Sequence, residues 1–477
     1  MKKIFFTVFV HIILLLSVTN AQVIIDTISL VCFENVNTEF CFNNSKLMAG
    51  NSVSDRYLVY YNSDTVFLNV YQSGIWTRKI AYTGSQIKSS TMAFNNDTIW
   101  LCWKEGVVLA QIKAMFSTDG GNTWTVIPPV SPVGNVAAPS VYASSNGKIH
   151  FVWHTSTSTD TRVFHRVFYN GSYLTSASSL SNPTAYGMWP SVIAIGDTVL
   201  CAWKEEPLPS QVWFRSSFDG GVSWNTLPTT PTTTLLALTK DPNLAYAYDS
   251  VTGTHYIYLA YDGQNKIYMQ RSTDFGNSWT LPDTVSSVDK LSQFAHIECN
   301  NNGFVGITYE QRPLGTSLFD DIHKEVGFTY STDWGNTGSF SVDSLAYTHN
   351  GFGSVFSAIN KIDENNFYLV WLTRDTVANK ALVLERHIHF NSSTGITFLQ
   401  DTNIHVSPNP FNEQISISND KSELSEVILY DIASRKIIQK KFIRSLSLYT
   451  EQLERGIYLY EVRCGSKLCR KGKLVKN

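Results

Sequence analysis

The chain contains few charged residues, and neither sign of charge is in marked excess. Charged residues make up 16% of the 477 residues, and the formal net charge is −2. A nearly neutral chain has no overall electrostatic attraction to nucleic acid. Helical periodicity of useful length is also missing. Aromatic residues, by contrast, reach 13%, and this composition favours β-strands over helices.

Motifs that mark common catalytic centres are missing as well. No CxxC pair or His/Cys cluster indicates zinc, so we expect neither a metal nor a cofactor. No nucleophile elbow, His-Glu-x-x-His motif or Cys/His pairing in context indicates a protease. These absences direct attention to binding functions and to enzymes that use carboxylates.

Cysteines are scarce, and the seven present divide into two kinds. Cys102 and Cys201 lie inside the apolar runs "IWLCW" and "VLCAW", where we expect buried core residues. Export allows disulfides, and two pairs are close enough in sequence to close small loops: Cys32 with Cys41, and Cys464 with Cys469. The odd count leaves at least one thiol free.

Only one long apolar run is present, from Ile4 to Val18, and the basic residues Lys2 and Lys3 precede it. The small residue Ala21 suits cleavage before the next position. Because the run is too short for a membrane span, it predicts a secretory signal peptide over residues 1–21; a signal anchor is the alternative. We expect the mature chain to leave the cytoplasm, with no transmembrane segment after cleavage.

The pattern Ser-x-Asp-x-Gly-x-x-Trp occurs three times, and a decayed copy, "STDWGNTG", follows at residues 331–338. In a tight hairpin turn the Asp accepts backbone hydrogen bonds, the Gly takes a positive φ, and the Trp covers the hairpin. The segment "FYNGSYL" at 168–174 is interpreted as an eroded copy. The residues expected in structural turns are Ser117, Asp119, Gly121 and Trp124; Ser217, Asp219, Gly221 and Trp224; Ser272, Asp274, Gly276 and Trp279; and Asp333.

Each copy belongs to a repeated order of short strands. An apolar strand, a polar turn, an aromatic strand such as "TIWLCWKE" and a third strand lead into each Asp turn. Seven such units extend over about residues 45–400, and four-stranded repeats of this length predict an all-β fold, a β-propeller. We expect seven blades; six is the alternative, if a terminal strand pair is mistaken for a blade.

The octet resembles the Asp box, or BNR repeat, of sialidases and related propellers. In sialidases, catalysis lies on the face opposite the Asp turns. By this resemblance, the candidate ligand-binding residues here end the second strands or begin the blades on that opposite face: Glu105, His154, Trp189, Glu205, Asp262, Glu310, Arg312 and Arg374. Aromatic side chains stack on sugars, and paired carboxylates can act as acid and nucleophile. Polar strand ends in solvent are the alternative explanation.

The chain departs from the sialidase pattern at a decisive place. Sialidases are implied to clamp the substrate carboxylate with three arginines, and an early Phe/Tyr-Arg-Ile-Pro segment supplies the first. That segment is missing here, since neither Arg56 nor Arg78 matches it. No catalytic residue is therefore transferred. The prediction is an exported, sialidase-like propeller that binds or processes glycans; the alternative is a non-catalytic adhesion or scaffold propeller that binds protein or polysaccharide.

Composition changes after about residue 400. The "VSPNPF" lead-in, the "GIYLYEV" strand and the Lys-rich "KLVKN" end resemble the C-terminal sorting domain of proteins exported by the type IX secretion system. The resemblance implies a β-sandwich over residues 401–477 that addresses the chain to this machinery, after a propeller over residues 22–400. The product is then released or attached to the outer cell surface. A small binding module is the alternative.

Overall fold

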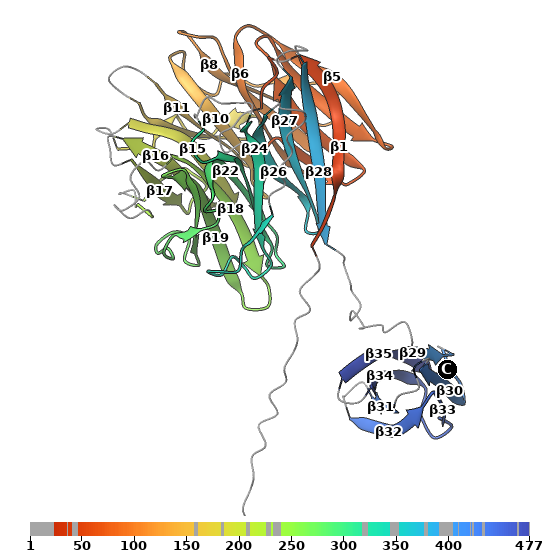
Figure 1. Ribbon diagram of the computed structural model, residues 1–477. Coiled ribbons are helices and arrows are strands. Elements are labelled where there is room, and N and C mark those ends of the chain that lie inside the picture. The colour runs from red at the N-terminus through yellow and green to blue at the C-terminus, as the bar shows by residue number, and fades with distance from the viewer. Residues whose placement is uncertain are drawn as a thin grey trace, which may run out of the picture. The chain divides into compact units, whose positions relative to one another are not determined.

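A computed structural model (Figure 1) describes residues 23–35, 37–40, 46–156, 161–182, 186–206, 210–225, 230–231, 240–316, 323–343, 353–375, 380–390, 404–408, 410–419, 421, 424–431, 435–464 and 467–476. The chain divides into one unit of residues 22–391 and another that contains residues 392–477. The described residues form strands and turns without an α-helix, which confirms the all-β prediction. Nowhere in these residues is a helix long and apolar enough to cross a membrane.

In the first unit, the described strands form seven antiparallel sheets. In chain order their strands are β2 (Met48–Ser52), β3 (Asp55–Tyr61), β4 (Thr65–Gln72) and β5 (Ile75–Thr83); β6 (Ile87–Asn95), β7 (Thr98–Glu105), β8 (Gln111–Ser117) and β9 (Thr125–Val126); β10 (Val136–Ala143), β11 (Ile149–Thr155), β12 (Val163–Tyr169), β13 (Ser172–Tyr173) and β14 (Ser178–Ser179); β15 (Tyr186–Ile195), β16 (Thr198–Glu206) and β17 (Gln211–Ser217); β18 (Lys240–Asp249), β19 (Thr254–Gly263), β20 (Lys266–Ser272) and β21 (Asp283–Thr284); β22 (Lys290–Cys299), β23 (Val305–Pro313), β24 (Glu325–Ser331) and β25 (Ser341–Asp343); and β26 (Ser354–Asp363), β27 (Asn366–Asp375), β28 (Lys380–Phe390) and β1 (Val23–Asn35).

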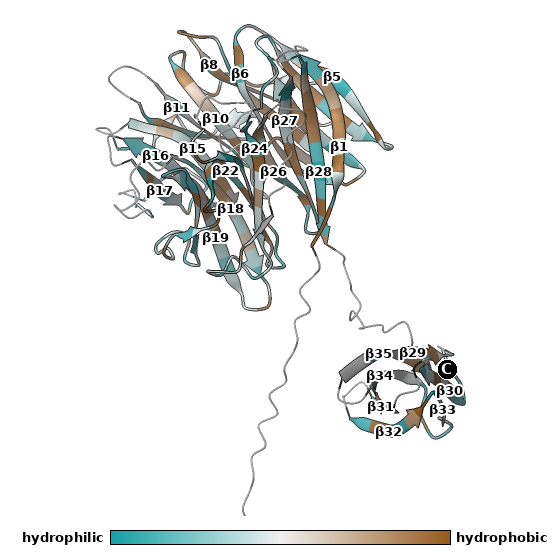
Figure 2. Cartoon of the chain, in the orientation of Figure 1, coloured by the Kyte–Doolittle hydropathy of each residue, from teal (hydrophilic) through white to brown (hydrophobic). Residues whose placement is uncertain are grey.

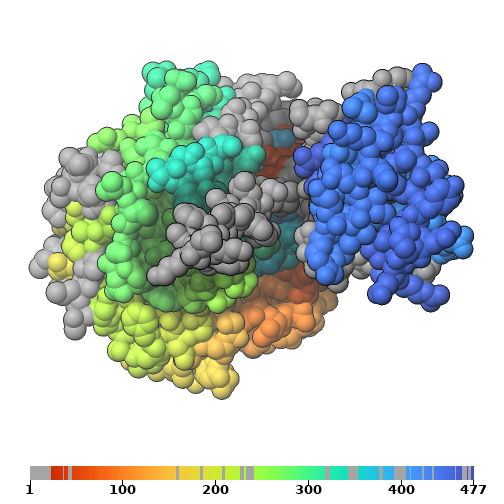
Figure 3. All heavy atoms as spheres, turned by 90° about the horizontal axis from the view of Figure 1, so that it is seen from below, coloured from red at the N-terminus to blue at the C-terminus, as the bar shows by residue number. Residues whose placement is uncertain are grey.

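The first strand of each sheet contacts the first strand of the next. The contacts run from β2 through β6, β10, β15, β18, β22 and β26, and β26 returns to β2. The sheets therefore follow one another around a ring in chain order, as the view from one end shows (Figure 3). This is the arrangement of a β-propeller, and hydrophobic residues concentrate in its strands (Figure 2).

The N-terminal strand closes this ring. Strand β1 pairs antiparallel with β28, so that Val23 lies opposite Phe390 and Asn35 opposite Lys380. The last sheet thus combines three strands from the end of the unit with one from its beginning. As a result, residues near position 26 and residues near position 388 become neighbours.

The Asp turns have the predicted hydrogen bonds. The Asp119 carboxylate accepts hydrogen bonds from the Ser117 hydroxyl at 2.7 Å and from the Thr123 N–H at 2.9 Å. The Ser117 hydroxyl oxygen also accepts one from the Gly121 N–H at 2.8 Å. The same bonds recur around Asp219 and Asp274. In the decayed copy, the Ser331 hydroxyl pairs instead with Ser339 at 2.7 Å.

Each Asp turn packs on the third strand of the preceding sheet. The Trp224 ring meets His165 of β12 edge-on, with 4.9 Å between centroids, and Trp279 meets Phe214 of β17 in the same way at 5.3 Å. Trp124 packs in the cluster that holds Leu68 of β4. The three tryptophans therefore occupy equivalent positions, and the Asp turns join neighbouring sheets.

A bulge recurs in the first strand of six sheets. At each bulge one non-glycine residue has a positive φ: Ser89, Ala138, Trp189, Asp241, Phe294 and Phe356. Opposite each bulge, the second strand carries a buried aromatic residue: Trp103, Trp153, Trp203, Tyr261, Tyr309 and Trp371. Left-handed backbone is costly for residues with a side chain, so these positions require support from their surroundings.

The second unit contains two described sheets. Their strands are β29 (Ile404–Ser407), β30 (Gln414–Asn419) and β33 (Ser445–Tyr449) in one, and β31 (Leu424–Tyr430), β32 (Lys436–Ile443), β34 (Gly456–Cys464) and β35 (Lys467–Lys476) in the other. Both sheets contribute to one hydrophobic cluster, which includes Ile417, Phe411, Val427 and Val462. The unit therefore has a core of its own.

The cysteine predictions are partly correct. Cys102 and Cys201 are buried, as expected for core residues. Cys32 is free, so it does not close the small loop with Cys41 that the sequence spacing allows. Its thiol lies instead 3.6 Å from the Tyr60 hydroxyl, and burial, the main influence, raises the pKa of Cys32 to about 11. Cys464 is disulfide-bonded, whereas the Cys469 side chain lies outside the described residues.

Candidate functional site

Two of the predicted ligand-binding residues support the bulges. His154 Nδ1 accepts a hydrogen bond from the Trp189 N–H at 3.4 Å, and the two rings meet edge-on. Glu310 Oε1 accepts one from the Phe356 N–H at 2.7 Å. In both cases a buried polar side chain accepts a hydrogen bond from the backbone N–H of the bulge residue in the next sheet, which has a positive φ. Burial lowers the pKa of His154 to about 3, helped by Lys104, so this imidazole is neutral at physiological pH.

Two further predicted residues accept hydrogen bonds from buried tryptophans. Glu105 Oε2 lies 3.2 Å from the Trp103 indole nitrogen, and Glu205 Oε1 lies 2.9 Å from that of Trp203. Glu205 also accepts the Asn182 N–H at 3.0 Å. Burial raises the pKa of Glu205, while these hydrogen bonds oppose the rise. Both tryptophans are fully buried, so the two carboxylates satisfy indole N–H groups that the fold removes from solvent.

The remaining predicted residues are also largely engaged within the protein. Asp262 and Arg312 are buried, with exposed fractions of 5% and 2%. Arg374 donates to the Thr38 carbonyl at 3.2 Å and stacks over Phe356. The residues predicted from the sequence are thus polar groups at one end of the sheets. Most of them contact other residues of the protein.

A different pocket lies where the ring closes, and we refer to it as the closure pocket. It measures about 490 Å³. Its lining comes from β1, β3, β4, β27 and β28: Ile25, Asp26, Thr27, Ser29, Arg56, Tyr71, Tyr368, Glu385 and His387. Its residues lie near the starts of the second strands β3 and β27 and near the ends of the third strands β4 and β28. The pocket is therefore at the same end of the sheets as the Asp turns.

A buried ion pair forms one wall of the closure pocket. Arg56 Nη2 lies 2.8 Å from Glu385 Oε1, which also accepts a hydrogen bond from the Trp76 indole at 3.2 Å. The guanidinium lies between Tyr71 and Tyr368, 3.6 Å and 4.3 Å from their ring centroids. Burial raises the pKa of Glu385, and Arg56 counteracts this effect. Cation–π contacts and the ion pair together fix the positions of the two tyrosines.

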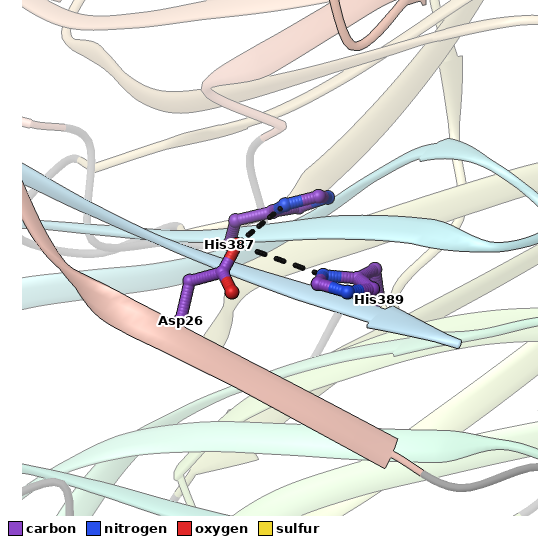
Figure 4. Close-up of side chains that lie close together, drawn as sticks. All are labelled: Asp26, His387 and His389. Atoms are coloured by element: carbon purple, nitrogen blue, oxygen red, sulfur yellow. Dashed lines mark hydrogen bonds and ion pairs between the residues drawn. The ribbon is translucent and has the colours of Figure 1, made fainter. Parts of the chain in front are cut away.

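Asp26, His387 and His389 form a second feature of this region (Figure 4). Asp26 Oδ2 lies 3.0 Å from His387 Nδ1 and 3.6 Å from His389 Nδ1. The other nitrogen of His387, Nε2, lies 2.9 Å from Asn366 Oδ1. Desolvation lowers the pKa of His387, although Asp26 acts in the opposite direction. No sequence motif indicates this cluster, because Asp26 and His387 are 361 positions apart.

Comparison with known proteins identifies the C-terminal part of the chain. Residues 405–477 match the family described as secretion system C-terminal sorting domain. This confirms the prediction of a sorting domain, and the chain is secreted or attached to the outer cell surface. No curated protein matches the chain.

Solved structures resemble the fold at low sequence identity. An ulvan lyase, described as a new family of polysaccharide lyase, is 12% identical with a TM-score of 0.53 over 74% of this chain and 94% of its own. A Dyadobacter fermentans protein of unknown function is 11% identical over 75% and 99%, with a TM-score of 0.45. A Trypanosoma rangeli sialidase mutant with trans-sialidase activity is 10% identical over 90% and 89%, with a TM-score of 0.42. The similarity to the lyase shows a shared fold.

Proposed function

We propose that this protein is an exported seven-bladed β-propeller that binds a polysaccharide outside the cell without cleaving it. Residues 1–21 act as the signal peptide, residues 22–400 form the propeller, and residues 401–477 form a sorting β-sandwich handled by type IX machinery. The seven sheets are its blades, and the Asp boxes are structural turns. The export address and the fold shared with a polysaccharide lyase support this role.

The closure pocket is the observation that carries the proposal. A pocket of about 490 Å³ has room for a sugar residue of a longer chain. Tyr71 offers an aromatic surface, and aromatic faces suit the apolar faces of sugar rings. Around it, Asp26 and Thr27 provide oxygen atoms that can accept hydrogen bonds from sugar hydroxyls. The site thus combines stacking with convergent polar groups.

Binding is favoured over hydrolysis because the predicted carboxylates already have partners. Glu105 and Glu205 accept indole hydrogen bonds, and Glu310 accepts the N–H of a bulge residue. A glycosidase needs two carboxyl groups directed at one scissile bond. The missing Phe/Tyr-Arg-Ile-Pro segment supports the same conclusion.

Surface adhesion or scaffolding through a protein partner is the second candidate. The turn between β7 and β8 exposes three consecutive apolar side chains, Val107, Val108 and Leu109, with exposed fractions of 59%, 75% and 76%. This turn belongs to the end of the sheets where the sequence predicts ligand binding. Exposed apolar groups that cluster in this way often mark protein contacts.

A glycan array with the exported protein identifies ligands, and calorimetry with the best polysaccharide then tests the pocket. We expect Tyr71→Ala to weaken binding about tenfold, the value of one aromatic contact. Tyr248→Ala is the matched control, since Tyr248 is 37% exposed on another sheet. A reducing-end assay on the same polysaccharides should detect no cleavage. Unchanged binding in Tyr71→Ala, or new reducing ends, would show that the proposed function is wrong.

A further inference from the structure

Three potential metal ligands converge from the two ends of the propeller chain. His387 and His389 are two positions apart on β28, so their side chains leave the strand on the same face. Asp26 lies in β1, where the pairing with β28 shifts register between Ile25 and Ile28. A bulge redirects a side chain, and this one directs Asp26 toward both imidazoles (Figure 4).

The hydrogen bonds around His387 determine which of its nitrogens carries a proton. Both Asp363 oxygens accept hydrogen bonds from the Asn366 side-chain nitrogen, each at 2.9 Å. The Asn366 oxygen is therefore the atom that faces His387 Nε2, and it accepts the Nε2 proton. In the neutral imidazole, the lone pair of Nδ1 then points at a carboxylate oxygen 3.0 Å away.

Two acceptors at this distance repel each other unless a proton or a cation lies between them. His389 brings a second ring nitrogen, Nδ1, to the same place. Its Nδ1 is shielded from solvent, lies 3.6 Å from Asp26 Oδ2, and lacks a hydrogen-bond partner among the described residues. The geometry therefore brings two imidazole nitrogens and one carboxylate around one position.

We propose that Asp26, His387 and His389 bind a zinc ion. Zinc lies about 2.0–2.1 Å from such ligands, so adjacent ligand atoms of a tetrahedral site are about 3.3 Å apart. The observed separations of 3.0 and 3.6 Å bracket this value. Imidazole nitrogens suit zinc, whereas calcium and magnesium prefer oxygen ligands throughout.

The surroundings fit a metal site in two further respects. The ring of His387 stacks on Tyr368, with 4.5 Å between centroids, and its Nε2 is hydrogen-bonded to Asn366. Metal-bound histidines usually have a hydrogen-bond partner at the nitrogen that does not bind the metal. Asp26 and His387 also line the closure pocket, which leaves room for a water molecule as the fourth ligand. Because the ligands join β1 to β28, zinc would fasten the N-terminal strand. This role does not depend on glycan binding.

Zinc binding is tested on the exported protein after removal of metals with a chelator and without any glycan. Calorimetry with zinc chloride should give one ion per chain and a higher melting temperature, since a ligand that binds only the folded state stabilises it. Cobalt chloride should give the visible absorption of a tetrahedral site. We expect His389→Ala to weaken zinc binding more than about 100-fold, since outer partners alone contribute about 10–100-fold.

Matched variants separate this site from adventitious binding. His255→Ala removes a half-buried histidine from another sheet, where Tyr246 contacts it, and should bind zinc as the parent does. Asn366→Ala should weaken zinc binding about 10–100-fold through the orientation of His387. Circular dichroism establishes that each variant is folded. Failure of the parent to bind zinc, or equal affinity in folded His389→Ala, would overturn the proposal.

Discussion

The Asp-turn carboxylates are held ionised by the hydrogen bonds that they accept. Asp219 accepts the Ser217 hydroxyl at 2.8 Å and the Ser223 N–H at 2.9 Å. Desolvation opposes ionisation of this group, but the hydrogen bonds from Ser223, Ser217 and Val222 outweigh it and lower the pKa of Asp219 to about 2. A carboxyl group in the unfolded chain has a pKa of about 3.9. The turn therefore stabilises the folded protein through its charge.

The Asp219→Asn variant tests this contribution. The folded-state pKa is the lower one, so the contribution is complete above about pH 4 and is lost as the pH falls toward 2. We expect the variant to be less stable by about 1 kcal/mol near neutral pH, after allowance for solvent screening. Urea unfolding of parent and variant at several pH values should show the difference shrinking in acid.

Asp333→Asn provides the comparison for this measurement, because the Ser331 hydroxyl in that decayed copy bonds to Ser339. Its effect should be smaller than that of Asp219→Asn. A difference for Asp219→Asn that is independent of pH would contradict the role assigned to its charge.

Local turn chemistry could be predicted from the sequence, whereas contacts between distant residues could not. The octet contains both the Asp and the groups that donate to it within four positions, so its bonds follow from spacing alone. By contrast, the contact of the Cys32 thiol with Tyr60 and the contact of Asp26 with His387 of β28 join residues that are far apart in the sequence. The proposed zinc ligands are separated by most of the chain, so no short sequence motif indicates them.

At the scale of elements, the glycine of each Asp turn permits close contact between sheets. Gly221 has a φ of 83°, and a Cβ placed there would lie 2.4 Å from His165 Cε1. A Cβ on Gly121 would likewise lie 2.4 Å from Leu68, and one on Gly276 would lie 2.1 Å from Phe214. The glycines are thus required by packing on the preceding sheet as well as by the turn.

The pair Gly221→Ala and Gly171→Ala separates these two requirements. Gly171 has nearly the same φ, 82°, but a Cβ there meets nothing within 4 Å. We expect Gly171→Ala to cost about 1–2 kcal/mol of folding free energy for backbone strain. Gly221→Ala should cost about 1–3 kcal/mol more, because the methyl group overpacks the contact with His165. Chemical unfolding measures both, and equal losses would refute the packing role.

The order of strands was predictable, but the bulges were not. Aromatic residues such as Trp103 and Trp203 mark the second strands in the sequence, and short polar turns separate them. The bulge residues that face them range from Ala138 to Phe356 and share no side-chain chemistry. The sequence alone therefore indicates ligand binding by His154 and Glu310, although each accepts a hydrogen bond from the backbone N–H of a bulge residue.

At the scale of the whole molecule, the N-terminal strand and the C-terminal unit have separate tasks. Strand β1 completes the last sheet of the ring and brings Asp26 to β28. The C-terminal unit has its own hydrophobic cluster and its own sheets, and it contains the sorting-domain match. Removal of the second unit should therefore leave the first unit's packing intact.

Deletion of residues 401–477 tests this division together with the address. Because the sorting domain directs export, we expect the truncated protein to accumulate in the periplasm and the parent to reach the cell surface or the medium. The truncated protein should unfold at the same temperature as the first unit of the uncleaved full-length chain, since each unit has its own core. Mass spectrometry of the exported parent should find a C-terminus near residue 400. Export of the truncated chain, with Asn477 still present on the mature parent, would instead favour a binding module, because a domain that is neither needed for export nor removed afterwards must act at its destination.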